Sequence, residues 1–331
     1  MGIRSLDFKL ILILTIQKSL IMRTNTSVLL KTRLLFILVF TFFTALYACD
    51  KNNDETIEKK TQPEEKEEEK NSNENKDKVA DYADIENLPA DTGGEQIAYL
   101  KGTTSASYGY YAYTPSAYKD GTEKYPLIIS LHGAGKRGDG NNLDDLKKVL
   151  WLGPGNLIKK GEWNPSYPAI VVAPLTSTNW DPKKVHAFIQ YLMDTYRVNE
   201  QRIYLTGNSM GGFGTWNYIQ EYGDEALAAA IIPICGKGNP DLAHQFTNIP
   251  VWAFHGVDDN TVNVNGSVDM VKAIKALEIE ITYTPKLTLY PGVGHDSWTM
   301  TYDGSGMGQE NENFDAFNMS IYDWLFRYKK E

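Results

Sequence analysis

Cysteine is nearly absent from this chain of 331 residues, which holds only Cys49 and Cys235. This scarcity excludes a framework of disulfides. Cys235 lies in the apolar stretch "AAAIIPICG", which indicates a buried and inert thiol. No group of cysteines and histidines has the spacing of a zinc site, so the sequence calls for no metal and no cofactor.

A surplus of basic residues is also missing. The 33 lysines and arginines are outnumbered by 42 aspartates and glutamates, which gives a formal net charge of −9. Proteins that bind nucleic acids present clustered positive charge to the phosphates. The charge balance therefore argues against a nucleic-acid partner.

Near the N-terminus, the apolar runs are short. "LLFILVFTFFTALYAC" (34–49) holds about 15 apolar residues, below the roughly 20 that span a bilayer comfortably. It follows Lys31 and Arg33, and a basic segment before a short apolar one is typical of a secretory signal, here residues 1–48. Met22 is an alternative start of the chain. Because residues 8–22 are also apolar, two membrane helices are the competing interpretation.

The end of this run, "LYAC", resembles the lipobox of bacterial lipoproteins. The resemblance implies that Cys49 is lipidated and becomes the mature N-terminus. It further implies an exported lipoprotein, held at the outer membrane or the cell surface. The acidic residues after Cys49 resemble the surface-export signals of some Gram-negative lipoproteins.

Residues 49–90 begin with "CDKNNDETIEKKTQPEEKEEEKNSNENKDK", which contains almost no apolar side chains. Such a segment cannot bury enough apolar surface to offset the entropy lost on ordering. We therefore expect a disordered tether, rich in acidic residues and lysine, between the lipidated cysteine and the domain.

Residues 91–331 predict one domain, large enough for a single well-buried core. Short apolar runs without strict alternation recur along it, as is typical of strands covered on both faces. Helical periodicity follows several of them, which predicts an α/β fold with a mostly parallel sheet and helices on both faces. The predicted strands cover 125–133, 168–175, 202–207, 228–236, 250–256 and 286–292, and the helices 181–198, 266–277 and 313–328.

Three of the predicted strands end in side chains suited to nucleophilic catalysis. Ser209 lies in "GNSMGG", Asp258 and Asp259 in "HGVDDNTV", and His295 in "GVGHDSW". In parallel sheets, ligands bind at the carboxyl ends of the strands. The order Ser, Asp, His is one of the known orders of a triad, in which a histidine takes the serine proton and a carboxylate orients the histidine.

A fourth strand end offers donors for an oxyanion. "SLHGAGKRGDG" (130–140) is a glycine-rich turn, and backbone N–H groups in such turns can stabilise a tetrahedral intermediate. By position, the N–H groups of Met210 and Ala134 are the candidates, with Gly135 as the reserve. His132 and His255 are expected to fix their loops by hydrogen bonds.

The four motifs "LHGAGKRG", "GNSMGG", "HGVDDNTV" and "GVGHDSW" resemble the α/β-hydrolase superfamily over residues 108–328. They are most similar to bacterial feruloyl and acetylxylan esterases and to dienelactone-hydrolase-like "predicted peptidases". The resemblance implies a serine esterase of α/β-hydrolase fold with little or no cap domain. The pattern His-Gly-x-x-Asp-x-x-Val selects Asp259, rather than Asp258, as the acid.

The predicted location at the cell envelope and the resemblance to esterases together suggest feruloyl or acetyl esters on fragments of plant polysaccharide, or similar small esters, as substrates. Trp180, Trp298 and the loop 151–168 are candidates to stack on an aromatic acyl group or a sugar ring, with ordinary core packing as the alternative. Two other functions compete. One is a serine peptidase of the same fold, and the other is an inactive lipoprotein that binds at the surface.

Replacing Cys49 by serine should release the protein from the membrane, because serine cannot carry the thioether-linked lipid. Fractionation of cells expressing each form, followed by immunoblotting, checks this. If the variant stays in the membrane fraction, a spanning helix explains the association and lipidation does not.

Overall fold

The computed structural model describes residues 80–331, which belong to one compact unit. The predicted signal peptide (1–48), Cys49 and the tether up to residue 79 lie outside the described residues. Within the described part, no helix combines the length and the apolar character needed to cross a membrane.

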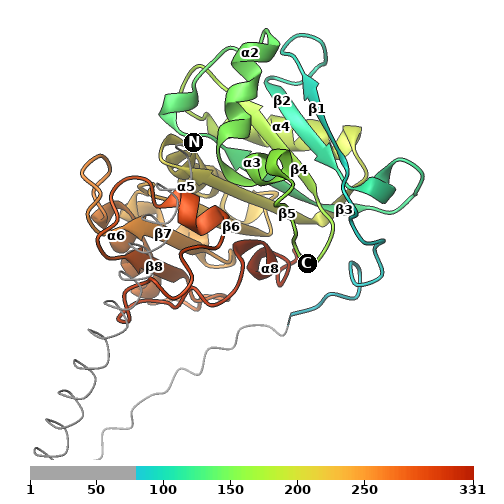
Figure 1. The fold of residues 1–331 in the computed structure, drawn as a ribbon. Coiled ribbons are helices and arrows are strands. Elements are labelled where there is room, and N and C mark those ends of the chain that lie inside the picture. Colours follow the sequence, from blue (N-terminus) through green and yellow to red (C-terminus); the bar gives the residue numbers. More distant parts are fainter. Residues whose placement is uncertain (1–79) are drawn as a thin grey trace, which may run out of the picture. The chain divides into compact units, whose positions relative to one another are not determined.

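One eight-stranded sheet forms the centre of the domain, in the order β1-β2-β4-β3-β5-β6-β7-β8 (Figure 1). From β4 to β8 every neighbouring pair is parallel, and β2 joins β4 and β1 by antiparallel pairing. The strands are β1 (Glu95–Tyr99), β2 (Gly109–Thr114), β3 (Tyr125–Leu131), β4 (Ile170–Leu175), β5 (Val198–Asn208), β6 (Ala230–Ile234), β7 (Trp252–Gly256) and β8 (Lys286–Tyr290).

All six predicted strands are present, as β3 to β8, and the predicted mostly parallel sheet is confirmed. Strands β1 and β2 were not predicted. Strand β2, "GYYAYT", contains no valine, isoleucine or leucine, so it lacks the aliphatic signature of the others. Strand β1 is short and half-exposed at the edge of the sheet, where the pattern of burial is weakest.

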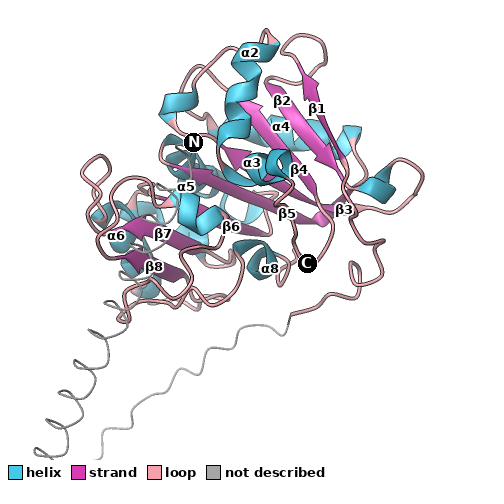
Figure 2. Ribbon diagram, in the orientation of Figure 1, coloured by secondary structure: helices cyan, strands magenta, loops and turns pink. Residues whose placement is uncertain are grey.

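Helices cover both faces of this sheet, as predicted (Figure 2). Successive residues of a strand point to opposite faces. Accordingly, Leu127 and Ile129 of β3 pack in one hydrophobic cluster, with α4, α5 and α6, whereas Ile128 packs in the other, with α3, α7 and α8. The helices are α2 (Leu143–Leu146), α3 (Gly153–Lys160), α4 (Pro182–Thr195), α5 (Met210–Tyr222), α6 (Asn265–Lys275), α7 (Trp298–Tyr302) and α8 (Ile321–Leu325).

The helix predicted over 313–328 is wrong for most of its length, because only α8 is helical there. The preceding residues run along the edge of β8 instead. The N–H groups of Asn311 and Asp315 donate to the carbonyls of Leu289 and Leu287, and the Asp315 carboxylate accepts from the N–H of Leu287. Pairing with an exposed strand edge satisfies these groups and outweighs the local helical preference.

The stretch 151–168, expected as a loop, contains α3. Pro154 stands in the first turn of this helix, where its missing N–H costs nothing. Gly161 ends the helix in the left-handed conformation, with φ of 73°. The glycines and prolines of this stretch are therefore helix-end signals as well as loop signals.

The tether was predicted to reach residue 90, and this boundary is wrong, because residues 80–90 pack on the domain. The side chain of Ile85 is fully buried. The carboxylate of Asp84 accepts two hydrogen bonds from the buried guanidinium of Arg202 in β5, at 2.7 and 2.6 Å. Arg202 also donates to the backbone carbonyls of Asp81 and Phe326. A charge buried this deeply needs such partners, so the segment is part of the fold.

Replacing Asp84 by alanine should lower the free energy of unfolding by roughly 2–4 kcal/mol, because the buried Arg202 charge then lacks its counter-ion. Urea denaturation followed by circular dichroism measures the change. Glu200→Ala is the matched control, since it removes a carboxylate from the exposed pair with Lys124 and should barely move the midpoint. Equal effects of the two substitutions would contradict the role given to Asp84.

Candidate active site

Ser209 lies at a sharp turn between β5, which ends at Asn208, and α5, which begins at Met210. Its backbone has φ of 54° and ψ of −119°, a conformation that residues other than glycine rarely adopt. The turn brings backbones so close that a Cβ on Gly211 would lie 1.9 Å from the Leu131 carbonyl oxygen, and one on Gly207 2.4 Å from that of Gly211. The glycines around the serine are therefore required by space.

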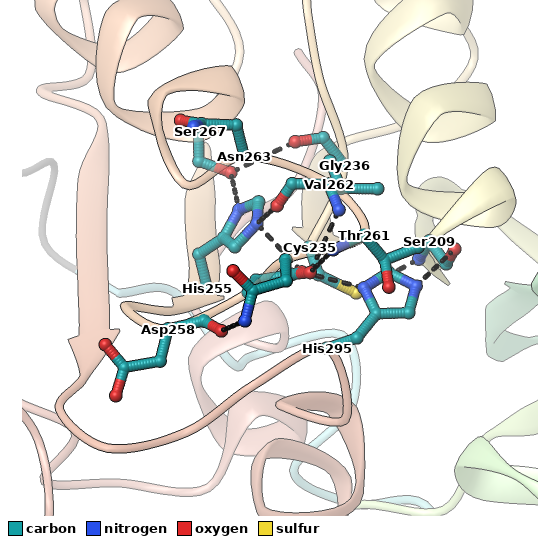
Figure 3. Close-up of polar contacts among 12 residues, drawn as sticks. Ser209, Cys235, Gly236, His255, Asp258, Thr261, Val262, Asn263, Ser267 and His295 are labelled. Carbon is teal, nitrogen blue, oxygen red and sulfur yellow. Dashed lines mark hydrogen bonds and ion pairs between the residues drawn. The ribbon is translucent and has the colours of Figure 1, made fainter.

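The three candidate side chains meet in an unbroken chain of hydrogen bonds. Nε2 of His295 lies 2.9 Å from the Ser209 hydroxyl oxygen (Figure 3). Nδ1 of the same ring lies 2.7 Å from Oδ2 of Asp259. Asp259 follows β7 and His295 follows β8, so each partner comes from a different strand end. The arrangement can pass a proton from the hydroxyl to an imidazole that a carboxylate orients.

Asp259, and not Asp258, faces the histidine. The side chain of Asp259 is fully buried, and its Oδ1 accepts from the N–H groups of Thr261 and Val262 at 2.8 and 2.9 Å. Burial alone would raise the pKa of Asp259, but the hydrogen bonds from His295 and from these two N–H groups hold it below the usual value. Asp258 is exposed and points away from His295 (Figure 3).

His255 supports the turn that holds Asp259. Its Nε2 donates to the carbonyl of Val262 at 2.9 Å, and its Nδ1 lies 2.8 Å from the hydroxyl oxygen of Ser267. Burial lowers the pKa of His255, so the ring is neutral, and its Nδ1 accepts from that hydroxyl. The ring thereby fixes the Val262 backbone whose N–H reaches Asp259.

His132 and Trp180 anchor the turn after β3. Nε2 of His132 accepts from the N–H of Thr176 at 3.1 Å, and Nδ1 donates to the Gly133 carbonyl at 2.8 Å. The indole N–H of Trp180 donates to the His132 carbonyl at 3.0 Å. Burial lowers the pKa of His132 to about 4, so the ring stays neutral near pH 7.

A hollow of about 310 Å³ opens beside Ser209, and we call it the central hollow. Ala134 and Met210 line it together with the serine, whereas Gly135 is not among its lining residues. The N–H of Met210 belongs to the first turn of α5 and therefore has no acceptor within the helix. Between the two oxyanion candidates after β3, the placement favours Ala134.

The two tryptophans proposed to contact substrate have different surroundings. Trp180 lines the central hollow, but it is 96 % buried and packs against His132 and Tyr108. Trp298 is half-buried, does not line this hollow, and packs edge to face with His295 at 5.1 Å. Both indole rings therefore pack against neighbouring side chains of the protein, as the alternative of ordinary core packing predicts.

Sequence reasoning missed three other residues at the site. Phe213, Arg137 and Asn179 line the central hollow, and Arg137 donates to the amide oxygen of Asn179 at 2.6 Å. A phenylalanine in the first turn of a predicted helix and an arginine in a glycine-rich turn carry no signal of their own. Their importance comes only from the packing of β3, β4 and β5 side by side.

Cys235 lies directly behind the serine. It has a φ of 40°, is fully buried, and its sulfur accepts from the N–H of Ser209 at 3.3 Å. Together with Asp259 and His295 it brings three metal-type ligands within 4.8 Å of one another. Burial raises the pKa of the thiol, so it is protonated, and the other two groups bond to each other. The three do not fit a metal site.

Because His132 is buried and neutral, acid should destabilise the fold. Between the ordinary histidine pKa of about 6.5 and the folded value of about 4, the unfolded chain binds a proton that the folded chain does not. Stability should therefore fall as the pH drops through this window, by up to about 3 kcal/mol from this group. Urea denaturation at pH 7.5, 6 and 5 measures the slope. His132→Gln should flatten it and His244→Gln, at an exposed site, should not; equal slopes would refute the assignment.

Comparison with known proteins shows which solved structures and which protein family this chain resembles. A solved structure described as a thermostable esterase is 30% identical, with a TM-score of 0.52, and the match covers 72% of this chain and 63% of that one. A feruloyl esterase module from Clostridium thermocellum, solved with sinapinate, shares the fold at 18% identity and a TM-score of 0.50, over 73% of this chain and 90% of that one.

A bifunctional acetylxylan esterase/xylanase of Neocallimastix patriciarum is 23% identical over 138 residues, which are 42% of this chain and 20% of the relative. The chain thus matches only part of the length of the esterase and of this relative. The model of the dienelactone hydrolase family matches residues 102–313, which include Ser209, Asp259 and His295 and make up well over half of the chain. The protein is therefore a hydrolase of α/β fold that belongs to the dienelactone hydrolase family.

Proposed function

We propose that this domain is a serine esterase that acts through an acyl-enzyme formed on Ser209. The observation that carries the proposal is the continuous chain from the Ser209 hydroxyl through His295 to Asp259, with contacts of 2.9 and 2.7 Å. Ser209 lines the central hollow, so a substrate carbonyl bound in this hollow can reach its hydroxyl. Binding without catalysis does not require a serine, a histidine and an aspartate joined by hydrogen bonds, so this geometry argues against an inactive binding protein.

In the first half of the reaction, the Ser209 oxygen attacks the ester carbonyl carbon while Nε2 of His295 takes the hydroxyl proton. The ionised Asp259 holds Nδ1–H and stabilises the positive imidazolium. When the tetrahedral intermediate collapses, the C–O bond to the alcohol breaks and the imidazolium gives its proton to the leaving oxygen. In the second half, a water oxygen attacks the acyl carbon while Nε2 of His295 takes a proton from the water. The bond to the Ser209 oxygen then breaks, this oxygen takes the proton back from His295, and the acid is released.

The negative oxygen of the intermediate needs donors that are in place beforehand. The N–H of Met210 and the N–H of Ala134 serve this role in the proposal, since both residues line the central hollow beside Ser209. His132 and Trp180 hold the Ala134 turn in position through the hydrogen bonds described above.

For the substrate, we propose feruloyl or acetyl esters on fragments of plant polysaccharide, or similar small esters. Support comes from the likeness to the acetylxylan esterase/xylanase and from the apolar walls of the central hollow, formed by Trp180, Met210 and Phe213. Its volume lies at the lower end of the range of about 300–1,000 Å³ for ligand sites, which suits a small acyl group.

We also propose that the domain is exported and held at the outer membrane or cell surface by a lipid on Cys49, after removal of residues 1–48. The stretch from Cys49 to residue 79 would then be the tether. The support is the sequence pattern alone, and the Cys49→Ser experiment described above tests it.

Ser209→Ala should lower kcat for 4-nitrophenyl acetate by about 10⁴- to 10⁶-fold, because no other group can form the acyl-enzyme. His295→Ala should have a comparable effect, since the hydroxyl then keeps its proton. Steady-state kinetics of the purified proteins, with circular dichroism to verify folding, gives the comparison. Turnover near that of the wild type in Ser209→Ala would refute the proposal.

The two aspartates provide a matched pair within the same experiment. Asp259→Asn should cost about 10⁴-fold in kcat, because the amide cannot orient and balance the imidazolium. Asp258→Asn, at the exposed neighbour, should retain the activity of the wild type. A panel of methyl ferulate, acetylated xylan, short 4-nitrophenyl esters and dipeptide amides then identifies the acyl group; cleavage of the amides in preference to all esters would show a peptidase instead.

A further inference from the structure

Two larger hollows flank the central hollow. The first flanking hollow, of about 600 Å³, lies between the loop after β3 and Ser177 after β4, and it shares Arg137 with the central hollow. The second flanking hollow, of about 530 Å³, lies between the loops after β6 and β7, and it shares Phe213 with the central hollow. Because Arg137 and Phe213 each line two of the hollows, the three hollows lie side by side, and we call this row of hollows the groove.

The strand order places the groove along the carboxyl edge of the sheet, with Ser209 in its central hollow. Along the carboxyl edge of the sheet, β4, β3, β5, β6 and β7 follow one another (Figure 1). Residues after β4 and β3 line the first flanking hollow, and residues after β4, β3 and β5 line the central hollow. The second flanking hollow is lined by residues after β6 and β7, together with Phe213 of α5. At about 4.8 Å per strand, the four spacings from β4 to β7 amount to roughly 19 Å. A small ester fills only the middle of this length.

The lining changes character along the groove. The centre has the apolar walls of Trp180, Met210 and Phe213. The first flanking hollow presents Asp139, Asn141 and Ser177, all of them exposed, and the second presents Lys237, Asn265 and Asp269, which are exposed as well. Both ends therefore offer hydrogen-bond donors and acceptors to solvent, whereas the middle offers apolar surface.

This lining matches a neutral chain of sugar units. Each hydroxyl of such a chain can donate and accept, so it can pair with amides, carboxylates and an ammonium alike. A polyanion would meet Asp139 and Asp269, and a polycation would meet Arg137 and Lys237, so a charged polymer would be repelled somewhere along the groove. An extended peptide would place apolar side chains against polar walls.

Resting on the esterase function proposed above, we propose that the groove binds an oligosaccharide on both sides of the esterified sugar. The acyl group occupies the central hollow, and the sugar chain runs into the first and the second flanking hollow. The preferred substrate is therefore an ester within an oligosaccharide, and the flanking hollows determine this preference.

The test compares two esters of one acid, the acid being the one that the substrate panel identifies. One ester is carried on an inner sugar of a xylo-oligosaccharide, and the other is the methyl ester. The measured quantity is the ratio of their kcat/KM values. Asn141→Ala in the first flanking hollow and Asp269→Ala in the second should each lower this ratio about three- to ten-fold, as expected for one lost hydrogen bond. Because the sites lie far apart, the double variant should show the product of the two factors.

Asp120→Ala is the matched control, since Asp120 is exposed and follows β2 at the opposite edge of the sheet, and it should keep the ratio of the wild type. An unchanged ratio in both groove variants would overturn the proposal, as would a larger gain from the same acid carried on a tetrapeptide. Both results would leave the esterase function standing, because hydrolysis of the methyl ester that depends on Ser209 would still be seen. Absence of any ester hydrolysis would instead refute the function itself.

Discussion

The sharp turn at Ser209, with φ of 54° and ψ of −119°, is the constraint from which the geometry at this edge of the sheet follows. A backbone held in such a conformation costs on the order of 1–3 kcal/mol, which the surroundings must offset. The N–H of Ser209 donates to the Ile234 carbonyl at 2.9 Å and fastens the turn to β6. The same turn starts α5, so Ser209 and Met210 line one hollow.

Around this turn, buried polar groups keep the site in one arrangement. His132 and His255 lie outside the chain of Ser209, His295 and Asp259, and each holds a loop in its neutral form. Their burial keeps them uncharged, and their two ring nitrogens then have distinct roles, one as donor and one as acceptor. Pre-organised donors and acceptors of this kind are what an acyl-transfer site requires, because they need no reorganisation during the reaction.

The sequence predicted the strand ends well, because each candidate side chain stands within a short local motif beside an aliphatic run. It also predicted which side chains would meet, since the carboxyl ends of parallel strands share one edge; the catalytic roles stay a prediction. Features that depend on distant contacts escaped it. Asp84 pairs with Arg202 across 118 positions, and residues 311–315 exchange a helical pattern for the edge of β8. Nor can a linear pattern show that Arg137 and Phe213 each line two neighbouring hollows.

The segment that runs along β8 also bears on how the protein behaves at high concentration. An open strand edge is a template on which a second chain can add a strand and begin to aggregate. Here the N–H groups of Asn311 and Asp315 donate to the carbonyls of Leu289 and Leu287, and the N–H of Leu287 donates to the Asp315 carboxylate. These hydrogen bonds are irregular and partly involve a side chain, so they offer no regular ladder to continue. Among the strands of residues 80–331, the short strand β1 forms the other edge of the sheet, so self-association by strand pairing would have to use β1.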